Sequence, residues 1–247
     1  MVLGGGDGAV IDPAVRTKGL VPVAGKPMIE WVARALRAAE SIGKIAVVLP
    51  QGTDTTAWAE QPDTIVASDG SFIDNALAGL SAFEHLAPVL ALTGDIPALT
   101  AEAIDDFVER SLASGAELTY AIVAEQDMEE QFPGSRRTYV KVDGVNVTGG
   151  NMMLLSPDLV RRNRDLAQRL FDARKSPLQM ARVLGGRFIF RYVVGTLRVE
   201  DVEAKMEELV GGPCAAIRTP HASIGADVDK PIDVVVVQRI LYARYGG

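Results

Sequence analysis

Three aspartates are the residues of this sequence best suited to bind a divalent cation. Asp95 stands in the tetrapeptide Gly94-Asp95-Ile96-Pro97, directly after an apolar run. Asp227 and Asp229 are two residues apart, and in an extended chain such side chains point the same way. Carboxylates beyond the end of a strand suit a Mg²⁺ ion held against phosphates. For Asp95 a turn aspartate is the alternative, whereas the nearby Asp233 is explained as a structural residue by the dipole of the helix it opens.

A glycine-rich stretch near the start of the chain has the composition of a phosphate-binding loop. It covers residues 4–8 and follows a short apolar run. Glycines let backbone N–H groups crowd around an anion, and Lys18 and Lys26 supply mobile positive charge further along. A plain turn explains the glycines equally well when they are taken alone. Other segments must therefore decide whether this is a nucleotide site.

Basic residues gather in the segment 160–198, which holds ten of them against two acidic residues, a local charge of +8. One interpretation is a wall or lid that receives an anionic acceptor. The interpretation we favour is a set of solvated helix faces, with arginines paired to Glu203, Glu207 and Glu208. Arg136 and Arg137 form a second basic pair that could bind an acceptor phosphate.

Composition excludes several classes of protein. The net charge of −7 argues against a general nucleic-acid-binding surface. The one cysteine, Cys214, excludes an internal disulfide and a cysteine metal cluster. His85 and His221 lack the spacing of zinc ligands. With no apolar run long enough to span a membrane and no leader sequence, we expect a cytoplasmic protein.

Strands and helices alternate over the first half of the chain, which predicts a parallel sheet covered by helices on both faces. The expected strands lie at residues 1–3, 44–49, 64–67, 88–93 and 118–123. The expected helices lie at residues 27–40, 72–85 and 101–114, the last capped by Thr100. In such a sheet the glycine loop and Asp95 both follow strands, so they should share the edge where ligands bind.

The second half of the chain has a different pattern. It predicts strands at residues 139–142, 151–155 and 215–219 and helical segments at residues 157–184, 200–210 and 231–244. We therefore expect one α/β, Rossmann-like three-layer domain over residues 1–247, with a mainly parallel sheet and a helical, arginine-rich insertion over residues 157–210.

Together these segments resemble the MobA-like nucleotidyltransferases. Residues 3–8 and 17–29 are similar to the family's L-A-G-G-x-G-x-R and K-x-L-L-P-V-x-G-K-P-L, and residues 94–97 to its metal-binding G-D-x-P. Residues 227–233 resemble its closing D-I-D-T-P-E-D. Residues 75–80 resemble S-V-x-x-G-L of cytidylyltransferase members, and residues 148–151 a segment that places an asparagine on the acceptor side. The family also includes molybdenum cofactor guanylyltransferase.

The chain departs from the family pattern at four positions, and three of these changes alter or remove a charged or polar side chain. Val10 stands where the family has the arginine of its first loop, and Arg16 is the nearest replacement. Gly4 replaces an alanine, while Lys230 and Ile232 replace threonine and glutamate in the closing motif.

The resemblance implies a GT-A-type nucleotidyltransferase that uses Mg²⁺. Its partners would be a nucleoside triphosphate and a phosphorylated small-molecule acceptor, with pyrophosphate released, and a homodimer is possible. The implied catalytic residues are Lys18, Lys26 and Arg16. The implied nucleotide-binding residues are Leu3, Gly4, Gly5, Gly6, Asp7, Gly8, Ser71, Asn75 and Gly94. The implied acceptor residues are Gly150 and Asn151, to which we add the basic pair Arg136 and Arg137. The implied metal ligands are Asp95, Asp227 and Asp229.

Two other functions remain open from the sequence. A GT-A-type glycosyltransferase would use a sugar nucleotide on the same sheet, but it would need a D-x-D after an internal strand. The D-x-D of this chain, at residues 227–229, stands near its end. A non-catalytic anion-binding module would act through residues 160–198.

Overall fold

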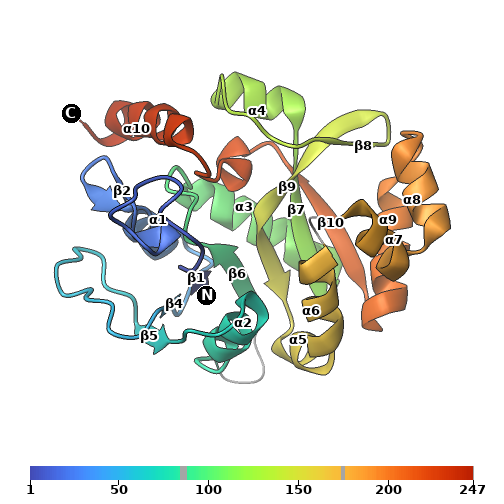
Figure 1. Cartoon of the computed structure of the whole chain (residues 1–247), viewed down its shortest axis with the longest axis horizontal. Coiled ribbons are helices and arrows are strands. Elements are labelled where there is room, and N and C mark those ends of the chain that lie inside the picture. The colour runs from blue at the N-terminus through green and yellow to red at the C-terminus, as the bar shows by residue number, and fades with distance from the viewer. Residues whose placement is uncertain (84–87, 174–175, 247) are drawn as a thin grey trace.

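The computed structural model describes residues 1–83, 88–173 and 176–246. A mixed sheet forms its centre, with strand order β10-β7-β9-β6-β1-β4-β5 and with β8 paired to β9 (Figure 1). Its strands are β1 (Val2–Leu3), β4 (Ala46–Leu49), β5 (Thr64–Ala67), β6 (Val89–Thr93), β7 (Leu118–Ala124), β8 (Val140–Val142), β9 (Val145–Leu155) and β10 (Cys214–Thr219).

Most pairs in this sheet are parallel, as the sequence predicts. Strand β1 pairs in parallel with β4 and β6, β4 with β5, and β7 with β10. Strand β9 runs antiparallel to both β6 and β7. It is reached from β8 through Asp143 and Gly144, whose positive φ angles of 51° and 78° suit a tight hairpin turn.

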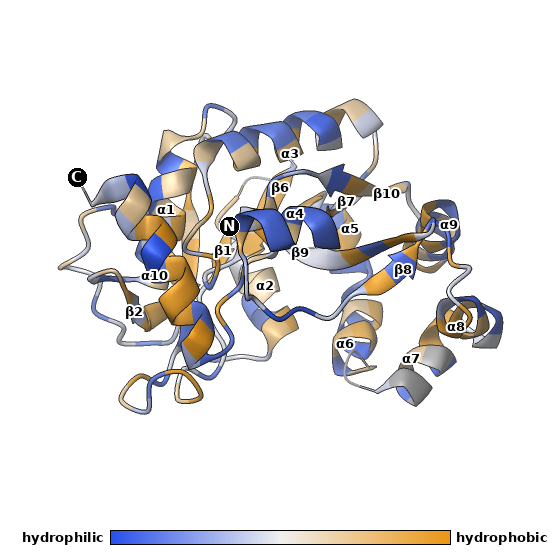
Figure 2. Ribbon diagram, turned by 90° about the horizontal axis from the view of Figure 1, so that it is seen from above, coloured by the Kyte–Doolittle hydropathy of each residue, from blue (hydrophilic) through white to orange (hydrophobic). Residues whose placement is uncertain are grey.

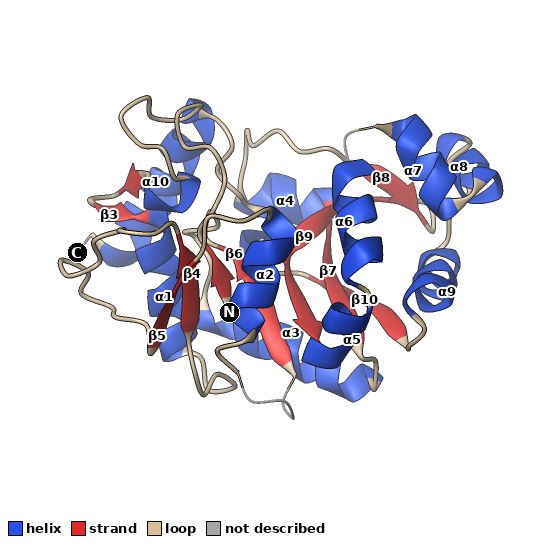
Figure 3. Ribbon diagram, turned by 60° about the horizontal axis from the view of Figure 1, so that its bottom comes forward, coloured by secondary structure: helices blue, strands red, loops and turns tan. Residues whose placement is uncertain are grey.

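Helices cover both faces of the sheet, as Figures 2 and 3 show. The helices are α1 (Met28–Ala38), α2 (Phe72–Leu80), α3 (Ala101–Ser114), α4 (Glu125–Gln131), α5 (Pro157–Arg162), α6 (Arg164–Ala173), α7 (Pro177–Leu184), α8 (Gly186–Val193), α9 (Val199–Val210) and α10 (Pro231–Tyr245). Short elements complete the list: the 3-10 helices η1 (Lys18–Leu20) and η2 (Ala222–Gly225) and the hairpin of β2 (Pro22–Val23) and β3 (Lys26–Pro27).

Two apolar layers hold the sheet between its helices. On one face Leu36 of α1 and Phe107 of α3 are buried against the strands. On the other face Leu80 of α2 packs with Val48 and Leu155. Helix α3 lies on one side of the sheet and α2 and α6 on the other (Figure 2). The Rossmann-like three-layer arrangement predicted from the sequence is confirmed.

Local signals account for the best-predicted boundaries. Helix α3 begins where the Thr100 hydroxyl accepts a hydrogen bond from the Ala103 N–H at 3.2 Å, and it ends at Gly115 with φ of 69°. Other boundaries differ from expectation. Helix α2 ends at Leu80, and His85 lies outside the described residues. Strand β9 starts six residues before the expected strand because it also pairs with β8.

Five arginines of the basic segment are paired with acidic side chains, but the partners expected for them were wrong. Glu203 and Glu207 accept hydrogen bonds from backbone N–H groups of β10, and Glu208 pairs with Lys205. The pairs found are Arg161–Asp158, Arg162–Glu117, Arg164–Asp74, Arg191–Asp201 and Arg198–Glu200. Residues 174 and 175 of the basic segment lie outside the described part. No helix in the described part combines the length and apolar character needed to cross a membrane.

Close packing of α2 on the sheet yields a stability prediction. A Cβ on Gly79 would lie 2.6 Å from Cγ2 of Val48 and would also clash with Sδ of Met1. Alanine favours a helix over glycine by about 1 kcal/mol, but overpacking of this kind costs about 1–3 kcal/mol. We expect Gly79→Ala to lower the free energy of unfolding by roughly 1–2 kcal/mol in urea titrations. Gly186→Ala, in open space at the start of α8, should leave it unchanged or slightly higher; equal stability of both variants would contradict the packing.

Candidate active site

Three carboxylates converge at the edge of the sheet where β1 and β6 end. Oxygens of Asp95, Asp227 and Asp229 lie within 4.8 Å of one another. A backbone hydrogen bond of 2.9 Å from the Val228 N–H to the Asp95 carbonyl joins the two segments. The Asp233 carboxylate accepts from the backbone N–H of Asp229 at 3.0 Å, and so it orients the segment as a structural residue. We call Asp95, Asp227 and Asp229 the aspartate cluster.

Two basic side chains neutralise part of the charge of the aspartate cluster. Nζ of Lys18 lies 2.5 Å from Oδ2 of Asp95 and also bonds to Oδ1 of Asp229. Nη1 of Arg137 lies 2.5 Å from Oδ1 of Asp227, and its Nη2 donates to the Asp227 carbonyl. The Arg137 side chain is only 7% exposed. With two cations against three ionised carboxylates, one negative charge is left uncompensated within the cluster.

The surroundings shift the ionisation of these groups in different directions. Burial, together with the neighbouring carboxylates, raises the pKa of Asp227 to about 6 although Arg137 opposes the shift. Burial acts the same way on Asp229, but the hydrogen bond and charge of Lys18 outweigh it and hold the pKa of Asp229 below its usual value. Burial would lower the pKa of Lys18, yet its two carboxylate partners raise it. Lys18 is therefore fully protonated in the cluster.

The aspartate cluster fits a hard divalent cation. Carboxylate oxygens are the ligands that Mg²⁺ prefers. Oδ1 of Asp95 is buried and has no hydrogen-bond partner among the described residues, which leaves a carboxylate oxygen free to coordinate. A buried unpartnered polar atom is costly unless it binds something. Asp95, Asp227 and Asp229 would hold the ion.

The glycine loop folds back on itself beside the aspartate cluster. The Gly4 N–H donates to the Val48 carbonyl at 3.0 Å, and a Cβ on Gly4 would lie 2.7 Å from Leu49. The Lys18 N–H donates to the Gly6 carbonyl at 3.0 Å, which fixes the start of the lysine side chain. The loop residues Gly5, Gly6 and Asp7 are exposed, and their backbone N–H groups have no partner among the described residues. These groups are donors for an anion.

Residues at the start of α2 lie against this loop. Oδ1 of Asn75 accepts from the Ser68 hydroxyl at 2.7 Å and from the Gly70 N–H at 3.1 Å. The amide nitrogen of Asn75 faces Gly5, where a Cβ would lie 3.8 Å from it. Ser71 caps α2 by accepting from the Asp74 N–H at 3.2 Å. The loop and α2 thus form one surface.

Three residues predicted as basic site groups make no ion pair with the aspartate cluster in the described part of the chain. Lys26 donates to Oε1 of the buried Glu30 at 3.0 Å. Arg16 and Arg136 are exposed and make no ion pair within the described part of the chain. Their catalytic and acceptor roles stay predictions.

Asn151 of β9 contacts the aspartate cluster. Nδ2 of Asn151 lies 3.2 Å from the Ile224 carbonyl and 3.4 Å from Oδ1 of Asp227. The pairing of β7 with β9 is irregular between Tyr120 and Ile122, opposite Asn151, and such bulges re-aim side chains near sites. Gly150 is buried against Ile224, where a Cβ would clash at 2.8 Å.

The pairing of Arg137 with Asp227 is the contact that sequence reasoning missed. The two residues are 90 positions apart, and Arg137 was expected to bind an acceptor phosphate. Nothing in the sequence around an arginine indicates an acidic partner 90 positions away. This ion pair therefore becomes apparent only in the tertiary structure.

A family comparison agrees with this geometry. The model of the MobA-like NTP transferase domain matches residues 1–187. The chain belongs to this family. The matched part contains the glycine loop, Lys18 and Asp95, whereas Asp227 and Asp229 follow it in the sequence. The resemblance stated from the motifs is confirmed, and the chain is a nucleotidyltransferase by family.

Solved structures extend the comparison over this MobA-like chain's whole length. A hypothetical transferase from Thermus thermophilus is 35% identical, with a TM-score of 0.84 over 94% of this chain and 97% of that one. CMP:2-keto-3-deoxy-manno-octonic acid synthetase complexed with CTP is 12% identical, with a TM-score of 0.60 over 98% of both chains. 2-C-methyl-D-erythritol 4-phosphate cytidylyltransferase, also from Thermus thermophilus, is 15% identical, with a TM-score of 0.56 over 97% of both. The two last matches show the fold. No curated protein sequence matches this chain significantly.

The position of Lys18 predicts competition between its amine and a metal ion. Lys18→Met leaves the carboxylates without their shared counter-ion, and we expect it to lower the metal-free stability by roughly 1–3 kcal/mol. Mg²⁺ alone should then raise the Tm of the variant more than that of the parent in thermal unfolding, because no ammonium group occupies the carboxylates. Lys205→Met removes an ion pair elsewhere and should respond to Mg²⁺ as the parent does. An equal metal response in all three proteins would contradict the assignment.

The raised pKa of Asp227 predicts a pH-dependent metal response. Because this pKa is about 6, the carboxyl group is mostly protonated at pH 5 and ionised at pH 7.5, and only the ionised form attracts a cation. The rise in Tm caused by Mg²⁺ should be clearly larger at pH 7.5 than at pH 5. Without metal, the contribution of Asp227 to stability is present at low pH and is lost as pH rises from about 4 to about 6. A metal response that is constant over this range would be the contrary result.

Proposed function

We propose that this protein is a Mg²⁺-dependent nucleotidyltransferase that joins the NMP unit of a nucleoside triphosphate to a phosphorylated acceptor and releases pyrophosphate. The observation that carries the proposal is the aspartate cluster with Lys18 between Asp95 and Asp229, directly beside exposed backbone N–H groups of the glycine loop. Membership of the MobA-like NTP transferase family supports it.

The chemistry joins two anions, so the main task of the protein is to neutralise and align charge. An oxygen of the acceptor phosphate attacks the α-phosphorus, and the bond from this phosphorus to the bridging oxygen of pyrophosphate breaks. The attacking phosphate is already ionised and needs no general base.

Each group would have a distinct role. The N–H groups of Gly5, Gly6 and Asp7 would hold phosphate oxygens, and the amide of Asn75 would lie near the base. The ammonium of Lys18 would stabilise charge that develops on the transferred and leaving phosphates. A bound Mg²⁺ would act as a Lewis acid that draws charge from the phosphate oxygens. Asn151, next to Asp227, would contact the acceptor.

Other assigned residues complete this proposal. Ser71, Leu3, Gly4, Gly8 and Gly94 would form the walls of the nucleotide site, and Lys26, Arg16 and Arg136 would supply positive charge from its rim. We also propose that helices in the segment 157–210 are an insertion into a single transferase domain.

The anion-binding module is the less supported function. It would need free positive charge on the basic segment, whereas five of its arginines are paired with acidic side chains. The charge available to a membrane or nucleic acid is correspondingly smaller.

A ligand screen tests the proposal. We expect one of ATP, CTP, GTP and UTP to raise the Tm in the presence of Mg²⁺ and to do so much less in EDTA, because ligand bound only by the folded state stabilises it. Asp95→Asn should abolish this metal-dependent rise and reduce pyrophosphate release by at least about 100-fold. Asp158→Asn, at an exposed acid of α5, should retain both.

The contrary outcome is equally definite. If no triphosphate stabilises the parent protein at millimolar concentration, or if Asp95→Asn keeps the full metal-dependent rise, the proposed function or its metal site is wrong.

A further inference from the structure

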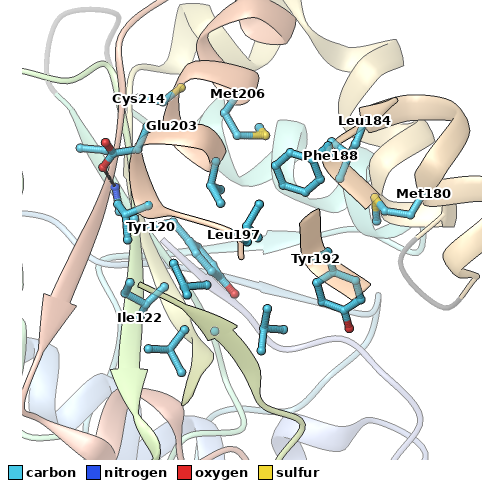
Figure 4. A pocket seen from close by; sticks show the side chains of 18 of the residues that line it. Tyr120, Ile122, Met180, Leu184, Phe188, Tyr192, Leu197, Glu203, Met206 and Cys214 are labelled. Carbon is cyan, nitrogen blue, oxygen red and sulfur yellow. Dashed lines mark hydrogen bonds between the residues drawn. The ribbon is translucent and has the colours of Figure 1, made fainter. Parts of the chain in front are cut away.

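A large apolar pocket opens on one face of the sheet. It has a volume of about 660 Å³ and lies between strands β7, β9 and β10 and helices α7, α8 and α9. Figure 4 shows Tyr120 and Ile122 of β7 facing Phe188 and Tyr192 of α8 across this space, with Met206 of α9 at its side. The volume is within the range of small-molecule sites.

The lining of the pocket suits a hydrocarbon and not a sugar. It is almost wholly aliphatic and aromatic, and the carboxylate of Glu203, its one acidic group, accepts from the Ala216 N–H at 2.8 Å. A ligand with several hydroxyl groups would find few partners, and each buried unpaired hydroxyl would oppose binding. A saturated or branched chain meets no such obstacle.

One wall of the pocket leads along β9 toward the aspartate cluster. The hydroxyl of Tyr120 lies over Gly149, so closely that a Cβ there would clash with it. Both residues line the pocket. Asn151, two residues further along β9 and about 7 Å of extended chain away, contacts Asp227 at 3.4 Å. A ligand with its chain in the pocket would therefore have its end near the cations and carboxylates of the site.

We propose that the acceptor is an amphiphilic phosphate monoester whose hydrocarbon chain occupies this pocket and whose phosphate points to the aspartate cluster. The inference rests on the proposed function and names the class of its acceptor. In the reaction a phosphate oxygen of the amphiphile forms a bond to the α-phosphorus and pyrophosphate leaves, while the chain itself is unchanged.

A series of alkyl phosphates tests the proposal. Pyrophosphate release is measured with Mg²⁺, the stabilising nucleoside triphosphate, and ethyl, butyl, hexyl or octyl phosphate below the concentration at which each forms micelles. Glycerol phosphate and a hexose phosphate serve as hydrophilic acceptors. Each buried methylene improves affinity by up to about fourfold. We expect KM to fall at least about tenfold from ethyl to octyl phosphate and the hydrophilic acceptors to resemble ethyl phosphate.

Neighbouring residues on α8 offer a matched pair of variants. Ile189 lines the pocket, whereas Phe190 is 66% exposed on the outer side of the helix. Ile189→Glu should raise KM for octyl phosphate at least about tenfold and leave KM for ethyl phosphate within about twofold. Phe190→Glu should change neither. Met180→Glu, on α7 at the same pocket, provides a second test if Ile189→Glu unfolds, with circular dichroism as the check on folding.

The outcomes separate this inference from the function on which it rests. If a triphosphate binds and pyrophosphate is released, but KM is independent of chain length, the pocket does not hold the acceptor and the inference is overturned while the transferase stands. If no triphosphate binds, the proposed function fails first. A dimer in analytical ultracentrifugation that Ile189→Glu dissociates, without any chain-length effect, would assign the pocket to a second copy and would also overturn the inference.

Discussion

Repulsion among three carboxylates is the constraint on which the rest of the site depends. Asp95, Asp227 and Asp229 place oxygens within 4.8 Å of one another. Two like charges about 4 Å apart repel by roughly 4 kcal/mol at the effective dielectric constant of a protein surface. Lys18 and Arg137 offset this by binding all three carboxylates, and a divalent cation would complete the compensation. The fold thus brings three carboxylates together at a place where cations can bind to them.

Strand direction and a few specific hydrogen bonds bring the three carboxylates together. Because β1 and β6 are parallel, the glycine loop and Asp95 leave the sheet at one edge. The bond from Val228 to Asp95 adds a segment from the other end of the chain, and Asp233 orients it. Lys18 is the counter-ion of the carboxylates, and its backbone N–H also bonds to Gly6 of the loop. Metal binding would free the Lys18 ammonium group from the carboxylates, so that it could bind phosphates. The same side chain would thus serve both the stability of the site and the proposed catalysis.

Local sequence patterns predicted the features that depend on neighbouring residues, such as helix ends and the residues that follow strands. The ends of α3 follow from Thr100 and Gly115, and the position of the glycine loop and Asp95 at one edge follows from the rule that ligands bind beyond strand ends. The partners of charged side chains depend on tertiary packing, so they could not be predicted from the sequence. Lys26 pairs with Glu30, five arginines of the segment 160–198 pair with acids other than those expected, and Arg137 pairs with Asp227. The apolar pocket was also missed, because its walls come from strands and helices that only the tertiary structure brings face to face.

The position of a bound cation shows directly whether the aspartate cluster is a metal site. Anomalous scattering from crystals grown with Mn²⁺ and a non-hydrolysable nucleoside triphosphate would locate the ion. We expect a peak coordinated by Asp95 and Asp227 or Asp229, with the Lys18 amine moved from the carboxylates to the phosphates. A cation bound elsewhere, or a triphosphate bound while Lys18 keeps both carboxylate partners, would contradict it.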